Sequence, residues 1–405
     1  THNSMPHFHI ISTLLLMLTL LLHVRGQSIL ELGGAVTAEY SHGAGHVAFY
    51  WSEVPRTGGR LSLREVNAQV GLNFHPRLSF RSRILLAQNP LGNLNDLQVA
   101  QANLQWRSKS EKLNLYLGRF LQPFGRFYSQ PLPQDRVFIS RPLTYNYYIN
   151  ISEQVGYTTS LDEPQALIID GRQDWGAPSG YFYGYGTGIK GKWDIKPDTL
   201  SVELALVQSA PISSRSFSNT FHPTLVFRTE FRPGYFWRQG ISFSRGGFLQ
   251  SRPINASLSN LSAFTQTMIG TDVEIAYGHF EIGGELVYSW YRVPFFNDST
   301  QQFVTDANGM NQTLQLQNLS GYVDIKYELP FWVGSYLAYR WEFIAFGEGV
   351  QGLGSSWDDN TNRNTLLWGY KITRNLTLKV GYSWQEIDTR DWALGTFRAA
   401  STLYF

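Results

Sequence analysis

Apolar and polar residues alternate one by one along most of the chain. In the stretch EVNAQVGLNF, an extended backbone places Val66 and Val70 on one side and Glu65 and Gln69 on the other. The stretches TLSVELAL, LSGYVDIKYE and NLTLKVGYSW repeat this alternation. A period of two residues is that of a β-strand with one apolar and one polar face, so the pattern predicts an all-β fold.

Short turns and longer polar loops alternate between these segments. Both ends of the chain fall on the short-turn side, as in antiparallel barrels that cross bacterial outer membranes, where short turns face the periplasm. We therefore expect a transmembrane antiparallel β-barrel, most simply of sixteen strands, although the boundaries also allow 14 or 18. The expected strands begin near residues 29, 62, 78, 95, 112, 181, 199, 222, 236, 264, 280, 314, 331, 362, 376 and 392.

Aromatic residues support a membrane-spanning barrel. They make up 15% of the chain and include 12 Trp and 22 Tyr. Trp106 and Trp237 lie beside short turns, whereas Trp290 and Trp341 lie near long loops. Indole and phenol rings prefer the boundary between headgroups and hydrocarbon, so this placement predicts two aromatic girdles.

The N-terminal region indicates export. The apolar run from Ile10 to Leu22 is shorter than the roughly 17–25 residues of a membrane-spanning helix and is followed by small residues. We expect residues 1–26 to be a signal peptide and residues 27–405 to be the barrel. A membrane protein that spans the bilayer without helices needs a closed barrel, so these features predict localisation in a bacterial outer membrane.

The last residues, RAASTLYF, read as a strand that ends on Phe405. This ending resembles the C-terminal signal of bacterial outer-membrane barrels, in which an aromatic residue follows alternating apolar positions. The resemblance implies that Phe405 is an assembly signal read by the barrel assembly machinery.

One connection is much longer than the others. Residues 122–180, after the fifth expected strand, are rich in aromatic and β-branched residues, which is not typical of disorder. We expect them to fold into the lumen as a constriction loop. An external cap or a plug is the alternative.

The stretch GRFLQPFGRF, from Gly118 to Phe127, begins this loop. It is similar to a G-[RK]-F-x-x-P-F-G motif of the phosphate-selective porin family and related porins. The resemblance implies a channel. Phosphate-selective members line the pore with many Lys and Arg, whereas the polar strand faces of this chain carry nearly equal numbers of basic and acidic residues, so the sequence departs from phosphate selectivity.

The polar strand faces, turned inward, predict two charged walls and a charged loop. General diffusion porins place an acidic loop opposite a basic wall, and we expect the same here. The alternative is that these charges pair along the wall and keep the lumen wet. The basic wall comprises Arg81, Arg83, Lys371, Lys379 and Arg398; the acidic wall comprises Asp272, Glu274, Glu281, Glu285 and Asp324; and the loop carries Arg126, Arg136, Arg141, Asp162, Glu163, Asp170, Arg172 and Asp174.

These features predict a porin, a passive channel for small hydrophilic solutes or ions with weak charge selectivity. The expected partners are outer-membrane lipid, lipopolysaccharide and, as one possibility, two further copies in a homotrimer. A closed structural or adhesive barrel is the main alternative, and an outer-membrane enzyme is another. The chain has no cysteine, and its motifs indicate no catalytic residues, metal or other cofactor.

Overall fold

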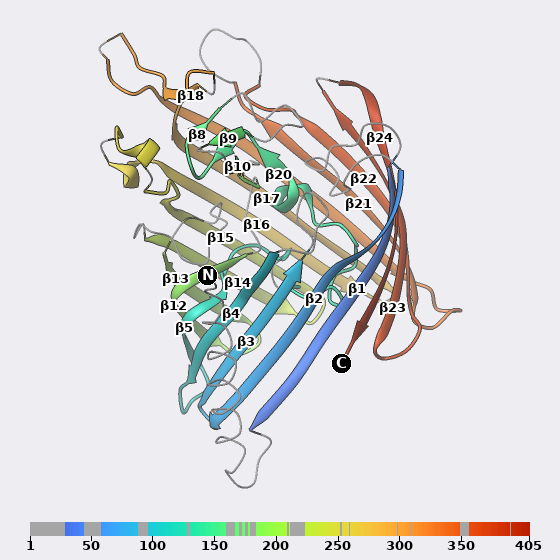
Figure 1. Ribbon diagram of the computed structural model, residues 1–405. Helices are drawn as coiled ribbons and strands as arrows, with labels where there is room; N and C mark the ends of the chain where they lie inside the picture. Colours follow the sequence, from blue (N-terminus) through green and yellow to red (C-terminus); the bar gives the residue numbers. More distant parts are fainter. Residues whose placement is uncertain are drawn as a thin grey trace, which may run out of the picture.

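The computed structural model forms a closed antiparallel barrel of sixteen long strands, which confirms the predicted fold and strand number (Figure 1). Each predicted strand start lies within four residues of the observed one. The structure describes residues 29–43, 58–87, 96–127, 130–158, 167–169, 172–174, 177–178, 184–208, 210, 223–251, 253–258, 260–297, 299–307, 309–348, 356–388 and 390–405. The predicted signal peptide lies outside these residues.

Consecutive barrel strands pair with each other, and the last pairs with the first. The barrel strands are β1 Leu30–Gly43, β2 Gly58–His75, β3 Leu78–Ala87, β4 Asp96–Arg107, β5 Leu113–Leu121, β12 Tyr185–Lys196, β13 Leu200–Val207, β14 Thr224–Gly234, β15 Trp237–Gly247, β16 Thr265–Tyr277, β17 Phe280–Pro294, β20 Thr313–Glu328, β21 Ser335–Phe346, β22 Thr361–Lys371, β23 Leu376–Ile387 and β24 Arg390–Tyr404.

The register places polar side chains inside and apolar side chains outside. On β16, Asp272 is buried and faces the lumen, whereas its neighbour Ile269 on the other face is 46% exposed. Asp272 stands opposite Glu285 on β17, and Thr271 stands opposite Leu286. An apolar outer surface of this kind is stable against hydrocarbon, because the backbone groups of the strands are paired within the closed sheet. Among the described residues, no helix has the length and apolar character needed to cross a membrane.

The barrel closes between β1 and β24. The Phe405 backbone amide donates to the Gly34 carbonyl at 3.1 Å, and the Gly34 amide donates to the Phe405 carbonyl at 3.0 Å. The Phe405 ring is 72% exposed. A Cβ on Gly34 would lie 2.7 Å from the ring, so the ring lies directly over this glycine.

Residues 122–127 and 130–158, together called the lumen segment below, fold into the barrel, as predicted for the loop after the fifth strand (Figure 1). The segment touches nearly opposite sides of the barrel: its Gly125 amide donates to Ser242 on β15, and its Arg136 guanidinium lies 3.7 Å from Glu65 on β2. Most of its described side chains are buried. It contains the short elements α3 Leu143–Asn146, β6 Tyr148–Ile149, β7 Ile151–Ser152 and β8 Gly156–Tyr157.

The other described elements belong to the loops. They are β9 Leu167–Ile169, β10 Arg172–Asp174, β11 Ala177–Pro178, η3 Pro253–Asn255, η4 Leu261–Ala263, β18 Phe296–Asn297 and β19 Gln302–Phe303. Of these, β11 pairs with β6 of the lumen segment.

Candidate functional site

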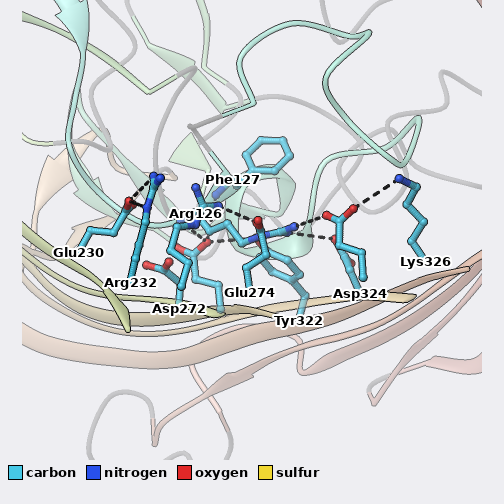
Figure 2. Close-up of polar contacts among 12 residues, drawn as sticks. Arg126, Phe127, Glu230, Arg232, Asp272, Glu274, Tyr322, Asp324 and Lys326 are labelled. Carbon is cyan, nitrogen blue, oxygen red and sulfur yellow. Dashed lines mark hydrogen bonds and ion pairs between the residues drawn. The ribbon is translucent and has the colours of Figure 1, made fainter. Parts of the chain in front are cut away.

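The start of the lumen segment docks on the predicted acidic wall, formed by β16, β17 and β20 (Figure 2). The Arg126 guanidinium is buried among three carboxylates. Its Nε lies 2.6 Å from Glu274, its Nη2 lies 3.1 Å from Glu281, and its Nη1 lies 3.8 Å from Asp324. The planar guanidinium presents several N–H donors in fixed directions, so one side chain can hold carboxylates from three strands.

Glu285 on β17 holds the backbone of the same residues. Its buried carboxylate accepts from the amides of Arg126 and Phe127, at 3.2 and 3.4 Å. It also accepts from the hydroxyl groups of Tyr322, at 3.2 Å, and Tyr145. Several donors on one carboxylate offset the cost of burying its charge.

Glycines make room for this docking. Gly125 has a φ of +66°, and a Cβ at this position would collide with Glu285 Oε1. A Cβ on Gly283 of the wall would lie 2.5 Å from the Arg126 Cζ atom. The Gly125 amide donates to Ser242 on β15 at 3.0 Å. The motif that begins the loop is therefore a close-fitting contact with the barrel wall.

The acidic wall residues also have cations from the barrel strands themselves. Three of these ion pairs join neighbouring strands and one, between Asp272 and Arg228, spans β15; together they balance most of the negative charge of the wall. They are Asp272 with Arg228 at 2.6 Å, Glu274 with Arg238 at 2.6 Å, Glu281 with Lys326 at 3.4 Å and Asp324 with Arg340 at 2.5 Å. The structure thus brings the five predicted acidic residues together, in a largely paired state.

The predicted basic residues lie on β3, β22, β23 and β24, around the seam of the barrel. Lys379 is buried and donates to the carbonyls of Pro133 and Arg136, at 2.9 and 2.5 Å. Arg398 lies 3.5 Å from Glu39. The remaining three differ in their surroundings: Arg81 lies 3.3 Å from Glu31, Arg83 donates to the hydroxyl of Tyr185, and Lys371 is exposed.

The described part of the loop brings arginines to the walls, and its Asp135 interacts electrostatically with Lys379 and Arg83 of the basic wall. Arg136 lies 3.7 Å from Glu65 on β2, and Arg141 lines a small cavity with these two residues. Asp162, Glu163 and Asp170 lie outside the described residues, and only the backbone is described for Arg172 and Asp174. The expected contact of the predicted acidic loop residues with the basic wall therefore stays a prediction.

One buried ion pair was absent from the sequence-based site. Arg363 on β22 donates from Nε to Glu342 at 2.7 Å and from Nη2 to the Arg141 carbonyl at 2.6 Å. Glu342 also accepts from the Leu143 amide at 2.7 Å. The polar face of TNRNTLLWGYK contains Arg363, so the alternation could have placed it in the lumen.

A cluster of apolar side chains lies in the outer part of the lumen. Tyr147, Ile151 and Tyr157 of the lumen segment belong to a buried cluster with Tyr291 of β17 and Trp357. The Tyr157 and Trp357 ring centroids lie 6.3 Å apart. Packed apolar side chains therefore occupy part of the interior of this half.

Polar groups at the edge of this cluster are paired. Asp358 accepts from the Asn150 amide at 2.8 Å and from the Tyr147 hydroxyl at 3.0 Å. Burial, together with the Asp358 charge, raises the pKa of Tyr147 well above its usual value. This hydroxyl therefore remains a donor.

Solved structures with the same fold are bacterial outer-membrane proteins. An anion-selective porin from Comamonas acidovorans superposes with a TM-score of 0.57 at 8% identity, covering 93% of this chain and 99% of the porin. OmpF of Salmonella typhi, in a complex with daunomycin, gives 0.55 at 13% identity and covers 93% and 97%. A loop-deletion mutant of OmpT, an outer-membrane protein of Vibrio cholerae, gives 0.57 at 9% identity and covers 93% and 99%. No family model and no curated protein matches the chain. The chain thus has the sixteen-stranded barrel fold of outer-membrane porins.

Proposed function

We propose that the protein is an outer-membrane channel for passive diffusion of small hydrophilic solutes and ions, and that the lumen segment forms its constriction. The observation that carries the proposal is a barrel lumen lined with acidic and basic side chains and crossed by a segment whose arginines meet the wall. Charged side chains that line a pore favour polar solutes and hinder apolar ones.

The pairing of charges favours weak selectivity. Carboxylates on the acidic wall have cationic partners within the wall, and Arg398 on the basic wall lies beside Glu39. A strongly selective pore needs a surplus of one charge along the path. Opposite charges within a few ångströms of each other leave only a small net field at physiological ionic strength.

Water reaches the lumen on the short-turn side. Arg81, Lys192 and Glu281 face inward and keep part of their side-chain surface exposed. We infer that this half is the vestibule through which solutes reach the lumen segment from the periplasm.

Single-channel conductance in planar bilayers tests the proposal. We expect the purified protein to form open channels with a small difference between anion and cation permeability. Deleting residues 130–156, joined by a short flexible linker, should raise the conductance several-fold, because the segment and not the barrel wall sets the narrowest area. Deletion that leaves an open channel unchanged would contradict a constriction at this segment.

A closed structural or adhesive barrel is the second candidate, and the apolar cluster in the outer lumen favours it. In that case the intact protein should show no conductance, and only the deleted variant should conduct. Among the described residues, no group of three or more His, Cys, Asp or Glu is placed to hold a metal ion. We propose that the protein is not an enzyme, because the lumen carboxylates are held in ion pairs with Arg and Lys side chains.

We further propose a homotrimer embedded in outer-membrane lipid and lipopolysaccharide and inserted by the barrel assembly machinery. One of the structures with this fold, OmpT of Vibrio cholerae, is described as a trimer form. Light scattering of the detergent-solubilised protein should give the mass of three copies, and a monomer mass would exclude the trimer.

A further inference from the structure

Each of the residues 124–127 contacts the barrel wall. Phe124 packs against Gly270, where a Cβ would lie 3.1 Å from its ring. Gly125 bonds to Ser242, Arg126 enters the carboxylate pocket, and the amide of Phe127 donates to Glu285. These contacts reach β15, β16, β17 and β20, four strands in one continuous part of the wall.

The charge balance of the pocket depends on Arg126. Four carboxylates face the guanidinium or its backbone, from Glu274, Glu281, Glu285 and Asp324. Arg238, Lys326 and Arg340 are ion-paired with three of them. Arg228 is paired with the adjacent Asp272. Loss of the Arg126 guanidinium would therefore make the pocket one unit more negative and leave Glu274, Glu281 and Asp324 without the cation that they share.

We propose that residues 124–127 are the anchor that holds the lumen segment across the barrel, and that Arg126 is the positioning residue that fixes the anchor and sets the charge preference of the constriction. The charge preference rests on the proposed channel function, whereas the anchoring does not. When Arg126 is absent, the carboxylates attract cations into the lumen and the segment loses its attachment.

A thiol placed beneath the anchor reports attachment without any measurement of conduction. Ser242 is fully buried below Gly125, and the chain has no cysteine of its own. In S242C, a water-soluble thiol reagent should react slowly, and in S242C/R126Q it should react several times faster. Ser110→Cys, at an exposed periplasmic turn, provides the fully reactive control.

Three further variants, each combined with S242C for labelling, separate anchoring from charge and from misfolding. Gly283→Ala places a Cβ 2.5 Å from the Arg126 Cζ atom without a change in charge, so it should also raise labelling at position 242. Arg126→Lys keeps the charge but lacks the guanidinium fork, so it should preserve charge preference while labelling rises. Arg77→Gln, at a periplasmic turn, removes one charge away from the pocket and should behave as the parent. All variants are first shown to migrate as folded barrels in SDS without boiling.

Reversal potentials in a salt gradient test the charge preference. R126Q should shift severalfold towards cation permeability, and R77Q should not shift. Unchanged thiol labelling at position 242 in folded R126Q and G283A would overturn the anchor. Increased labelling with an unchanged reversal potential would overturn the role in selectivity. Increased labelling in a protein that never conducts would leave the anchor standing and refute the channel.

Discussion

At the level of single residues, Arg363 and Glu342 show how charges are kept buried on the lumen wall. Their side chains are 2% and 0% exposed, and each also bonds to the backbone of the lumen segment. A buried ion pair contributes little to stability compared with apolar packing, but removal of one partner leaves an uncompensated charge.

Arg363→Ala should therefore lower the free energy of unfolding by about 3–5 kcal/mol. The reason is that the buried Glu342 carboxylate would lose the Arg363 guanidinium and keep the hydrogen bond from the Leu143 amide. Urea unfolding in detergent measures the change. The double variant R363A/E342Q should recover part of the loss, and failure to recover any would show that packing of the arginine, not its charge, is responsible.

The individual contacts of the site could be predicted only in part. Alternation placed Glu274, Glu285 and Asp324 in the lumen because strand geometry fixes which face a residue occupies. Alternation does not say which side chain from the loop meets them, since that depends on contacts between residues far apart in sequence. The sequence therefore predicted that Arg126 lies in the constriction, but it did not predict which carboxylates bind it. Arg363, at the start of its strand, was not predicted as a site residue.

At the level of elements, the strands followed directly from the sequence. Lipid on one side and water on the other impose the period of two on every strand, and turn residues mark each end. The lumen segment has no such repeat, because it does not separate lipid from water. Its inward fold was predicted from its length and aromatic content, but α3 and the short strands β6 to β8 were not.

The seam between β1 and β24 gives a prediction for one element. Phe405→Asp should reduce the amount of assembled barrel, because the ring lies over Gly34 where the last strand joins the first. A charge near the membrane interface costs only about 0–1 kcal/mol, so the defect should be in assembly and not in the stability of assembled protein. The heat-modifiable fraction in isolated membranes measures it, with Phe405→Tyr as the control. Equal membrane yields for both variants would contradict the prediction.

At the scale of the whole molecule, the protein has two layers of structure. The outer layer is the barrel, held by backbone pairing around a closed sheet. The inner layer is the lumen segment, held by Arg126 on one wall, Lys379 on another and an apolar cluster in the outer lumen. The inner layer can therefore lose contacts without opening the barrel.

Ile151→Ala and Tyr157→Ala test this separation. Ile151 is fully buried in the apolar cluster, and truncation of such a side chain costs about 2–5 kcal/mol. The double variant should show faster hydrogen exchange over residues 143–158 while the barrel keeps its resistance to SDS. Loss of SDS resistance at the same time would mean that the two layers unfold as one unit.

The long sequence separation of the inner contacts has a consequence for the order of events during biogenesis. Leu143 and Glu342 are 199 positions apart, and Pro133 and Lys379 are 246 positions apart. The wall residues that bind the segment belong to strands that come later in the chain. The segment therefore cannot form these contacts until those strands have paired. Closing loops of this length is slow compared with pairing adjacent hairpins. In a refolding time course of S242C, we expect SDS resistance to appear before the introduced thiol becomes protected, which makes arrival of the segment in the lumen the last step of maturation.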